Sequence, residues 1–496
     1  MDLSKLQNGS DVRGVALPGV AGESVTLDDA AVRAAAGGFV RWARQKLGKT
    51  ALRVSVGRDS RLSGAAISQA LCETLAACGV SATDLGLCTT PAMFMSTVTG
   101  ETPFDAAVMI TASHLPWNRN GLKFFTAAGG AESADVREIL RLAAEPAPEA
   151  PDGSVQTGEF METYAAILRG KIIAAANGNE TPLAGKRIVV DAGNGAGGFF
   201  AERVLAPLGA DTTGSRYLDP DGRFPNHVPN PELPEAMDSI RAAVLENRAD
   251  FGIIFDTDVD RAGAVLADGE ELNRNRLIAL ISAILLRDHP GTAIVTDSIT
   301  STGLAEFIAA HGGVHRRFRR GYRNVINEAL RLNAAGQDCQ LAIETSGHAA
   351  LKENYFLDDG AYLVTRFLME IAAGRSLEGL LKGLREPAES REFRLKILAD
   401  DFRAEGEAVL AALAAFAGAQ PGWSIAPDNF EGVRVNLDKA HGDGWFLLRL
   451  SLHDPILPLN IESDSAGGVR TIARQLAPFL AQQSGIDASP ALDFTW

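Results

Sequence analysis

The chain has 496 residues, a formal net charge of -15, 46% hydrophobic residues and 22% charged residues. This composition is typical of a soluble globular protein with several domains, and the acidic balance argues against nucleic acid or an anionic membrane as partner, because phosphate groups bind to basic surfaces. The four cysteines show no C-x-x-C spacing, so neither a zinc site nor a disulfide framework is indicated.

The N-terminus and the best apolar run predict no membrane segment. The stretch MDLSKLQNGSDVRG is polar and lacks the apolar core of a signal peptide. The run LIALISAILL, residues 277–286, is about half the length of a membrane span and is flanked by Arg276 and Arg287. We therefore expect a buried helix at this run and a cytoplasmic protein.

One local pattern recurs three times: a short β-branched run, an Asp, and a Gly/Ser/Thr turn that leads into an Ala/Leu-rich helical stretch. The copies are RVSVGRDSRLSGAAISQAL from Arg53, RIVVDAGNGAGGFFAERVL from Arg187 and AIVTDSITSTGLAEFIAAHG from Ala293. Each predicts a buried strand whose end delivers a loop to the start of a helix, which is where ligands gather in α/β sheets. The sequence therefore predicts three related α/β domains.

Two compositional breaks predict linkers, EPAPEAPDGSVQTGE at 145–159 and REPAESRE at 385–392. Beyond them we expect a helix at 401–416, strand-like VRVNLD, a turn HGDGW, strand-like FLLRLSL and a final helix RTIARQLAPFLAQQ. These elements predict a smaller C-terminal α+β domain. The expected domains are 1–150, 151–267, 268–386 and 387–496, and the fold class is α/β with mixed sheets.

The stretch TASHLPWNRNGLKFF places Ser113 beside His114 in a turn-rich loop, with Lys123 ten residues after the serine. Taken alone, this serine is either a nucleophile or an ordinary polar residue of a loop. The loop by itself does not decide between these interpretations.

The segment FDTDVDR carries three carboxylates, Asp256, Asp258 and Asp260, directly after the apolar run FGIIF. So much negative charge at the end of a buried strand favours a site for a hard cation such as Mg²⁺ over a solvated acidic turn. An EF-hand calcium loop fails on spacing, because Arg261 stands where glycine is needed and Ala267 where glutamate is needed. Arg261 is available for a nearby phosphate.

The glycine segment GNGAGG at 193–198 fits the dinucleotide-binding pattern, which would suggest a nicotinamide-dependent oxidoreductase. Asp191 intrudes between the strand and the glycines, and no ribose-binding acid ends an apolar strand about 20 residues later. We prefer close packing of a helix against a strand as the role of these glycines.

The segment LAIETSGHAALKENY places Glu344, Ser346 and His348 after a short apolar strand. Glu344 and Ser346 can present an acceptor and a donor to sugar hydroxyls, and His348 can transfer a proton. For any one of these residues, a satisfied turn residue is an equally good interpretation.

Two basic segments leave alternatives open. The run HRRFRRGYRN from His315 to Asn324 is either a solvated face or the wall of a cleft that captures phosphate. In RLSLHDP, Arg449, Ser451 and His453 alternate and could grip a phosphate, but a half-buried strand with one polar face explains the segment as well.

Together these segments resemble the α-D-phosphohexomutases. TASHLPWNRNGLK is similar to the phosphoserine loop of that family, FDTDVDR to its metal loop, ETSGH to its sugar loop and RLSLHDP to a variant of its C-terminal phosphate loop. VGRDSRLSG, VVDAGNGAGG, PDGRFPNH and DVRG are also similar to family segments. The resemblance runs in the family's order from about Asp11 to Pro455 and implies four domains around a central cleft.

The resemblance also implies an activity, the interconversion of hexose 1-phosphate and hexose 6-phosphate, with mannose or glucose as the sugar. It implies a phosphoserine enzyme, a sugar bisphosphate as intermediate or activator, one Mg²⁺ per chain, and a monomer or dimer. Phosphoglucosamine mutase stays open, and so does a sugar-phosphate-binding homologue with weak turnover, because Leu452 and His453 replace a small residue and a threonine of the family's phosphate loop.

Site residues follow from the same resemblance, position by position. Ser113 would carry the phosphoryl group and contact the Mg²⁺ held by Asp256, Asp258 and Asp260. Substrate binding is expected at Glu344, Ser346, Arg261, Arg319, Arg449, Ser451 and His453, and proton transfer or charge stabilisation at Arg13, His114, Lys123 and His348.

Overall fold

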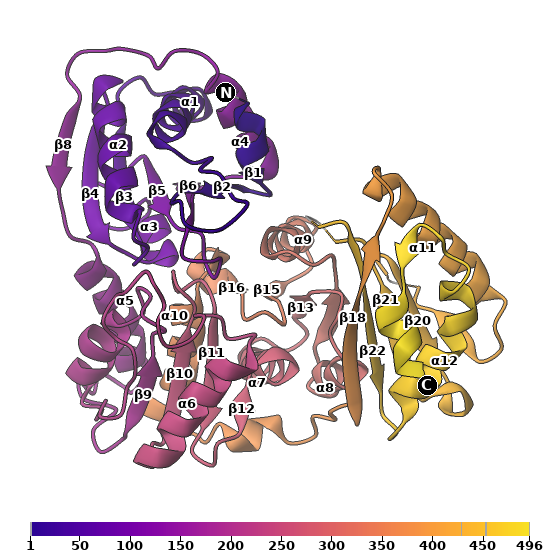
Figure 1. Ribbon diagram of the computed structural model, residues 1–496. Helices are drawn as coiled ribbons and strands as arrows, with labels where there is room; N and C mark the ends of the chain where they lie inside the picture. Colours follow the sequence, from indigo (N-terminus) through magenta and orange to yellow (C-terminus); the bar gives the residue numbers. More distant parts are fainter. Residues whose placement is uncertain (1, 428, 452–453, 496) are drawn as a thin grey trace. The chain divides into compact units, whose positions relative to one another are not determined.

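The computed structural model describes residues 2–427, 429–451 and 454–495, which form two compact units (Figure 1). The first unit contains Met1–Ile281 and Ser346–Leu380, and the second contains Ser282–Thr345 and Leu381–Trp496. The chain leaves the first unit within helix α7 (Arg274–Asp288) and returns to it at Ser346. The segment 268–386, predicted as one domain, therefore contributes residues to both units.

The N-terminal part of the first unit is a mixed sheet in the order β1-β2-β6-β5-β3-β4-β8, with β7 paired to β6. The strands β5, β3, β4 and β8 run parallel to one another, and β1, β2 and β6 pair antiparallel. Helices cover the sheet and share its apolar core. The strands are β1 (Gln7–Asn8), β2 (Asp11–Val15), β3 (Arg53–Arg58), β4 (Ser81–Leu87), β5 (Ala106–Ile110), β6 (Arg119–Thr126), β7 (Gly129–Gly130) and β8 (Ser154–Thr157), and the helices are η1 (Leu3–Leu6), α1 (Asp29–Leu47), α2 (Gly64–Ala77), α3 (Thr90–Met95) and α4 (Ser133–Leu142).

Helix α1 shows why these segments adopt their structure. It begins after Asp28, whose side chain accepts a hydrogen bond from Ala31 N, and it ends at Gly48, which takes the left-handed conformation that terminates helices. The helix packs closely on α4, because a Cβ on Gly38 would lie only 2.2 Å from the carbonyl oxygen of Ile139. Phe39 stacks on Phe124 of β6 at 5.0 Å between ring centroids.

The first predicted linker is partly wrong, because residues 154–157 form the edge strand β8, parallel to β4. All four residues of β8 are exposed, so the strand buries no side chain that an apolar pattern would reveal. Backbone pairing with β4 holds it instead, and an edge strand of this kind leaves no hydrophobic signal in the sequence.

The rest of the first unit is built on a second mixed sheet, in the order β12-β11-β10-β9. The glycines of GNGAGG follow β9, and Gly195 allows close packing, but against a loop instead of the expected strand: a Cβ on Gly195 would lie 2.6 Å from the carbonyl oxygen of Thr257, after β10. The helical turn after them is a π-helix, η2. The elements are α5 (Met161–Ala175), β9 (Ile188–Asp191), η2 (Phe200–Leu205), η3 (Ala206–Leu208), α6 (Pro234–Asn247), β10 (Phe251–Phe255), β11 (Ala262–Leu266), β12 (Glu271–Leu272), β16 (Ala349–Leu351), η4 (Lys352–Asn354), β17 (Leu357–Asp358) and α10 (Gly360–Ala372).

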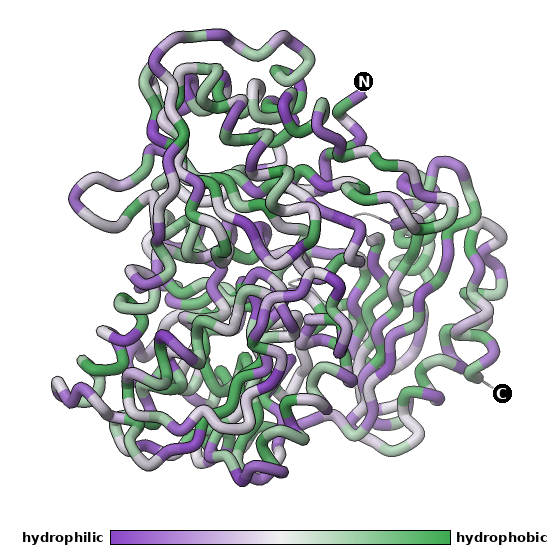
Figure 2. The backbone as a smooth tube through the Cα atoms, turned by 60° about the vertical axis from the view of Figure 1, so that its left-hand side comes forward, coloured by the Kyte–Doolittle hydropathy of each residue, from purple (hydrophilic) through white to green (hydrophobic). Residues whose placement is uncertain are grey.

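The second unit combines a parallel layer with an antiparallel sheet. Its three parallel strands lie in the order β14-β13-β15, and its six-stranded sheet has the order β19-β20-β21-β22-β18-β23. From Phe393 to Ile397 of β18, buried apolar residues alternate with exposed charged ones, because one face of this sheet packs on the core. Figure 2 shows green and purple segments alternating along the strands on the side of the C-terminus. The elements are β13 (Ala293–Thr296), α8 (Thr302–Ala310), β14 (Val314–Arg317), α9 (Tyr322–Ala334), β15 (Cys339–Ile343), β18 (Glu389–Ile397), α11 (Phe402–Gly418), β19 (Trp423–Ile425), β20 (Val433–Leu437), η6 (Lys439–His441), β21 (Gly444–Leu448), β22 (Ile456–Ser463), α12 (Gly468–Leu480), β23 (Ile486–Asp487), α13 (Ser489–Leu492) and η7 (Asp493–Thr495), with η5 (Glu378–Leu381) preceding β18.

The C-terminal predictions hold for both helices and for the strand VRVNLD, but two details are wrong. The linker predicted at 385–392 ends early, because β18 begins at Glu389. The strand predicted as FLLRLSL ends at Leu448, so Arg449 and Ser451 lie in the loop after β21. Leu452 and His453 lie outside the described residues.

The fold class predicted from the sequence, α/β domains with mixed sheets followed by a sheet-rich α+β domain, is confirmed. Within α7, the side chains of the predicted apolar run from Leu277 to Leu286 are buried, as expected. In the part of the chain that the structure describes, no helix is both long and apolar enough to cross a membrane.

Candidate active site

Ser113 lies in the loop between β5 and β6, with a buried side chain and a backbone in the left-handed region, at φ 50°. A non-glycine residue adopts this conformation only where its surroundings hold it. The Ser113 N–H donates to Thr111 Oγ1 at 2.9 Å, and its Oγ donates to Asp256 Oδ2 at 3.0 Å. The hydroxyl therefore points at the first aspartate of FDTDVDR.

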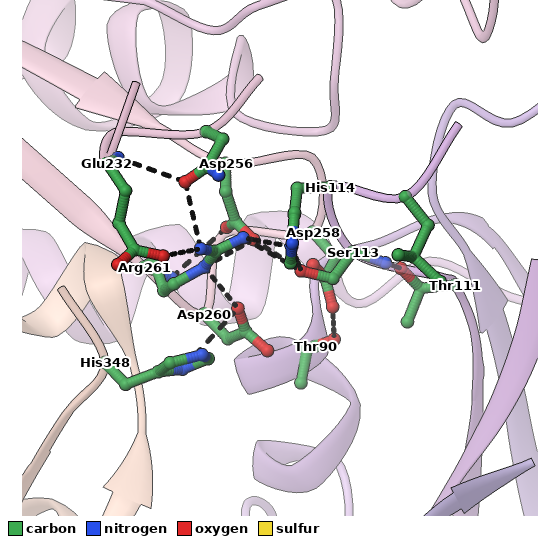
Figure 3. A network of polar contacts seen from close by, with 12 residues as sticks. Thr90, Thr111, Ser113, His114, Glu232, Asp256, Asp258, Asp260, Arg261 and His348 are labelled. Atoms are coloured by element: carbon green, nitrogen blue, oxygen red, sulfur yellow. Dashed lines mark hydrogen bonds and ion pairs between the residues drawn. The ribbon is translucent and has the colours of Figure 1, made fainter. Parts of the chain in front are cut away.

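The three aspartates follow strand β10 in a turn whose central residue, Val259, is also left-handed, at φ 67°. Asp256, Asp258 and Asp260 are at most 1% exposed, and each offers one carboxylate oxygen within 4.8 Å of the other two. Figure 3 shows them grouped between Ser113 and His348. The solvated turn considered from the sequence is thus excluded.

Two cations meet this acidic group. Lys123, from β6, donates to Asp260 Oδ2 at 2.5 Å and lies 3.3 Å from Asp258 Oδ2. Arg261 is 1% exposed, donates through Nη2 to Asp256 Oδ2 at 3.1 Å and to Ser113 Oγ at 3.1 Å, and contacts Asn230 Oδ1 at 3.0 Å. The site thus places two fixed positive charges beside the serine hydroxyl and the aspartates.

The aspartate oxygens fit a divalent cation. Asp258 Oδ1 and Asp260 Oδ1 are buried and have no hydrogen-bond partner among the described residues. Leaving a carboxylate oxygen buried without a partner is costly, and hard oxygen ligands are those that Mg²⁺ prefers. The donor set therefore suits a magnesium ion held by Asp256, Asp258 and Asp260.

The carboxylates titrate differently because their neighbours differ. Burial and the nearby charge of Asp260 raise the pKa of Asp256 well above its usual value. Burial acts in the same direction on Asp260, but the charges of Lys123, His348 and Arg261 outweigh it and hold its pKa well below the usual range. Asp260 therefore stays charged, whereas Asp256 would lose its proton when a cation binds beside it.

The two histidines of the site are in opposite protonation states. His114 Nδ1 accepts a hydrogen bond from Arg261 Nη2 at 2.8 Å, and burial together with the charge of Arg261 lowers its pKa to about 2. His348 Nδ1 contacts Asp358 Oδ2 at 2.5 Å; burial lowers its pKa, but Asp358 and Asp260 outweigh that effect and raise it to about 9. At neutral pH, His114 is therefore neutral and His348 is a cation.

Arg13 lies in β2, where it donates to Asp11 Oδ2 at 2.8 Å, and its charge adds to the lowering of the His114 pKa. Ser346 is buried in the same unit, and its Oγ has no hydrogen-bond partner among the described residues. The structure thus gathers Ser113, His114, Lys123, His348 and the FDTDVDR residues around one point, with Arg13 beside them.

Sequence reasoning missed several residues that complete this site. Arg61 contacts the carbonyl oxygens of the Ser113 loop, Thr90 donates its hydroxyl hydrogen to Asp258 Oδ2, and Asp358 holds His348. VGRDSRLSG is marked in the sequence as a strand–loop–helix repeat and as a family segment, but neither feature points to Arg61. Nothing in TTPAM or FLDDG marks Thr90 or Asp358 as partners of site residues. These contacts depend on tertiary packing.

In the second unit, Glu344 is buried and accepts a hydrogen bond from Gly321 N at 2.6 Å, which places it beside the basic run. The run is not simply a solvated face. Arg316 donates to Glu328 at 2.9 Å, and Arg317 donates to the carbonyl oxygen of Ser301 at 2.7 Å. These two arginines are therefore occupied within the fold.

Arg319 and Arg449 approach the same loop of the C-terminal domain. Arg319 is exposed and donates to the carbonyl oxygen of Phe430 at 3.0 Å, and Arg449 Nη1 lies 4.0 Å from Glu431 Oε1. Arg449 is 7% exposed, burial lowers its pKa, and its Nε has no hydrogen-bond partner among the described residues. Ser451 Oγ accepts from Asp454 N at 3.3 Å, so its position is set by the loop.

Family models match most of the chain. The model described as phosphoglucomutase/phosphomannomutase, alpha/beta/alpha domain I, matches residues 4–148; the domain II model matches 163–269 and the domain III model matches 273–387.

Curated relatives and a solved structure agree with these matches. The chain is 31% identical over 435 residues to the phosphomannomutase/phosphoglucomutase of Pseudomonas putida, covering 86% of this chain and 87% of that protein. It is 30% identical over 423 residues to the phosphoglucomutase of Neisseria gonorrhoeae, covering 85% and 86%. The crystal structure of a phosphoglucomutase/phosphomannomutase family protein from Burkholderia thailandensis matches with a TM-score of 0.80 at 27% identity, covering 98% of this chain and 100% of that one. The chain belongs to the phosphoglucomutase/phosphomannomutase family of α-D-phosphohexomutases.

Proposed function

We propose that this chain is a Mg²⁺-dependent phosphohexomutase that interconverts hexose 1-phosphate and hexose 6-phosphate, with mannose, glucose or both as the sugar. One observation carries the proposal: a buried serine hydroxyl lies 3.0 Å from Asp256 and 3.1 Å from Arg261, in the same site as Asp258, Asp260 and Lys123. Family membership supports it, since relatives at 30% or 31% identity bear the names phosphoglucomutase, phosphomannomutase and phosphomannomutase/phosphoglucomutase.

In this reaction, phosphorylated Ser113 gives its phosphoryl group to a free hydroxyl of the sugar phosphate. The Oγ–P bond breaks, a sugar O–P bond forms, and a sugar bisphosphate results. The bisphosphate turns round in the site, and its other phosphoryl group returns to Ser113, so that the net change moves phosphate between positions 1 and 6. Phosphoryl transfer demands mainly positioning and charge neutralisation, which is what buried cations supply.

The residues around Ser113 divide this work. Arg261 contacts both the serine Oγ and Asp256, so its guanidinium is placed to neutralise charge on a phosphoryl group at Ser113. Lys123 does the same from the side of Asp260. Neutral His114 accepts a hydrogen bond from Arg261, so we propose that His114 orients this arginine. Arg13 would add positive charge nearby.

Proton movement is assigned to His348. Its pKa of about 9 makes it a cation at neutral pH, so it can donate a proton to the sugar oxygen that loses its phosphoryl group in the second transfer. In the first transfer a proton goes to the Ser113 oxygen that loses its phosphoryl group and the attacking sugar hydroxyl gives one up, so His348 begins and ends each transfer as a cation.

Asp256, Asp258 and Asp260 would hold one Mg²⁺ per chain next to Ser113. When bound, the ion supplies electrostatic stabilisation of negative charge on the phosphoryl oxygens. The buried Oδ1 atoms of Asp258 and Asp260, which have no hydrogen-bond partner among the described residues, support this assignment.

Recognition of the substrate would fall to residues of the second unit together with Ser346 of the first. We assign Glu344 and Ser346 to the sugar hydroxyls, and Arg319, Arg449 and Ser451 to the phosphate that is not transferred, as the family resemblance of their segments implies. His453, the remaining candidate for that phosphate, lies outside the described residues. The free Nε of Arg449 supports its part in this assignment. We further propose that the enzyme is cytoplasmic and is a monomer or dimer.

A coupled assay with glucose 1-phosphate, mannose 1-phosphate and glucosamine 1-phosphate, each with and without Mg²⁺ and with a bisphosphate activator, tests the proposal. We expect Mg²⁺-dependent turnover of glucose or mannose phosphate that falls by several orders of magnitude in Ser113→Ala. Intact-mass measurement should find one phosphate on a fraction of wild-type chains and none on the variant.

Full activity in Ser113→Ala would contradict the phosphoserine mechanism. Turnover of glucosamine 1-phosphate alone would replace the proposed substrate class with that of a phosphoglucosamine mutase. Binding of all three sugar phosphates without turnover would mean a sugar-phosphate-binding homologue.

A further inference from the structure

Two segments that resemble the family have no part in the proposed reaction: VGRDSRLSG, from the end of β3 to the start of α2, and PDGRFPNH, between β9 and α6. Within the first unit they pack against each other around one side chain, Arg61. Arg61 is among the largest fully buried side chains of the described chain, and its side chain is 0% exposed. A buried arginine is costly unless its donors are satisfied.

The two terminal nitrogens of Arg61 donate to a single stretch of backbone, whereas its Nε has no hydrogen-bond partner among the described residues. Its Nη1 donates to the carbonyl oxygens of Pro116 at 2.8 Å and Arg119 at 3.0 Å, and its Nη2 donates to those of Leu115 at 2.6 Å and Ser113. These carbonyls belong to the loop that carries the proposed nucleophile and to Arg119, the first residue of the strand that follows it. The fork of one guanidinium thus fixes the path of the backbone from Ser113 to Arg119.

The contact between Arg61 and the Ser113 carbonyl oxygen affects the position of the Ser113 hydroxyl. Ser113 is held at φ 50°, a conformation that serine leaves readily when its neighbours allow it. Fixing the peptide plane that follows Ser113 also fixes the direction of its Cα–Cβ bond. Since Oγ must meet Asp256 at 3.0 Å and Arg261 at 3.1 Å, a change in that direction would misplace the reacting oxygen.

The other segment covers Arg61. The backbone of Gly222 lies so close to the Arg61 loop that a Cβ there would come within 2.5 Å of Ser60 O and of Leu62 N. Two residues later, the Phe224 ring centroid lies 5.3 Å from the guanidinium carbon of Arg61. A covering ring keeps water from the guanidinium, and in a dry environment its hydrogen bonds to the carbonyls are stronger.

We propose that Arg61 is a positioning residue for phosphoryl transfer at Ser113, and that the segment Gly222–Phe224 holds it in place by covering it. Arg61 touches no reacting atom; it acts through the loop backbone. Its counter-ion is Asp59, whose carboxylate lies 3.4 Å from Arg61 Nε and is equally buried. The role in catalysis rests on the proposed function, whereas the effect on the loop does not.

Arg61→Lys tests whether the guanidinium group is needed, because lysine keeps the charge but cannot donate to all four carbonyl oxygens at once. Phe224→Leu tests the cover with little change of volume and leaves Arg61 itself intact. We expect kcat to fall roughly 10- to 100-fold in Arg61→Lys and about 3- to 10-fold in Phe224→Leu, with KM changed by less than about threefold. Arg169→Lys is the matched control, since Arg169 also donates to a backbone carbonyl, that of Arg203, outside this loop.

Hydrogen–deuterium exchange on the full-length chain gives a second readout that needs no activity. Peptides covering residues 113–121 should exchange faster in Arg61→Lys and in Phe224→Leu than in wild type, whereas peptides covering α1 should not change. If Arg61→Lys does not fold, Phe224→Leu decides the question alone.

Unchanged exchange at 113–121 in the folded variants overturns the proposal, whatever the activity. Faster exchange together with an unchanged kcat also overturns it, because the arginine would then only stabilise the fold. If wild type itself accepts no phosphoryl group from a sugar bisphosphate, the proposed function fails, and the exchange data alone then decide whether Arg61 positions the loop.

Discussion

At the scale of single residues, Thr90 shows how a side chain outside the reacting group orients a proposed metal ligand. Its hydroxyl donates to Asp258 Oδ2 and its N–H donates to the Asp258 carbonyl oxygen at 2.9 Å. With one carboxylate oxygen engaged, the other, Oδ1, stays free. Residues that orient metal ligands in this way commonly influence metal affinity.

Thr90→Val should therefore weaken Mg²⁺ binding by about 10- to 100-fold, because Asp258 loses the contact that orients it. The measurement is the Mg²⁺ concentration that gives half of the metal-induced rise in Tm. Thr97→Val is the matched control, since Thr97 is also buried but donates to the Phe94 carbonyl oxygen. Equal Mg²⁺ dependence of the two variants would contradict the prediction.

A second residue, His227, links stability to pH. Its Nδ1 lies 2.9 Å from the Val228 carbonyl oxygen and its Nε2 lies 3.0 Å from Asp191 Oδ1. A carbonyl and a carboxylate both accept hydrogen bonds, so the protonated ring, which has a hydrogen on each nitrogen, satisfies both contacts. Burial lowers its pKa, but the bond to Asp191 and the charge of that carboxylate outweigh burial, and the pKa is raised above 6.5.

The pKa of His227 is higher in the folded than in the unfolded state, so protonated His227 stabilises the fold. This stabilisation is fully present below about pH 6.5 and is lost as the pH rises through the pKa of the folded state. Tm should accordingly fall between neutral and alkaline pH by a larger amount in wild type than in His227→Gln. His311→Gln serves as the control. Parallel pH profiles for wild type and His227→Gln would refute this assignment.

At the scale of elements, the interior glycines of two helices have opposite roles. Gly38 of α1 lets that helix approach α4, since a Cβ there would lie 2.2 Å from the Ile139 carbonyl oxygen. Gly170 of α5 has nothing within 4 Å of the position of a Cβ. The first glycine is required by packing, whereas the second only weakens its helix.

Gly38→Ala should reduce the free energy of unfolding by about 1 to 3 kcal/mol, because the two helices must separate. Gly170→Ala should increase it by about 0.5 to 1 kcal/mol, because alanine favours the helix and limits the unfolded chain. Urea unfolding of both variants measures the difference. If the free energy of unfolding changed in the same direction in both variants, packing would not explain the difference between Gly38 and Gly170.

At the scale of the whole molecule, the proposed work is divided between the two units. Ser113, the three aspartates, Lys123 and His348 belong to the first unit, whereas Glu344, Arg319, Arg449 and Ser451 belong to the second. The chain crosses between the units within the segment ETSGH, between Thr345 and Ser346. Our division into four domains at 150, 267 and 386 stays a prediction.

Arg449→Met should lower kcat/KM for hexose 1-phosphate roughly 10- to 100-fold, as expected for the loss of a charged hydrogen bond to phosphate. Mg²⁺ affinity should not change, because every proposed ligand lies in the other unit. Arg394→Met is the control, since the Arg394 side chain is 68% exposed on β18. Loss of Mg²⁺ affinity in Arg449→Met would refute the division of roles.

The sequence by itself determined the fold class, the three strand–loop–helix repeats and the segments that carry chemistry. These features are local: an apolar run, a turn and a cluster of carboxylates can be read within a few residues, and FDTDVDR indicates a cation site wherever it lies. Backbone pairing at the edge strand β8 left no such pattern, and the extent of the strand before Arg449 was overestimated.

Only the tertiary structure decided which residues meet. Thr90, Arg61 and Asp358 complete the site through contacts with residues 168, 52 to 58 and 10 positions away in the sequence. It also decided protonation, since His114 and His348 are the same residue type with pKa values of about 2 and about 9. Burial and neighbouring charge set those values, and both arise only when strands and loops from distant parts of the chain pack together.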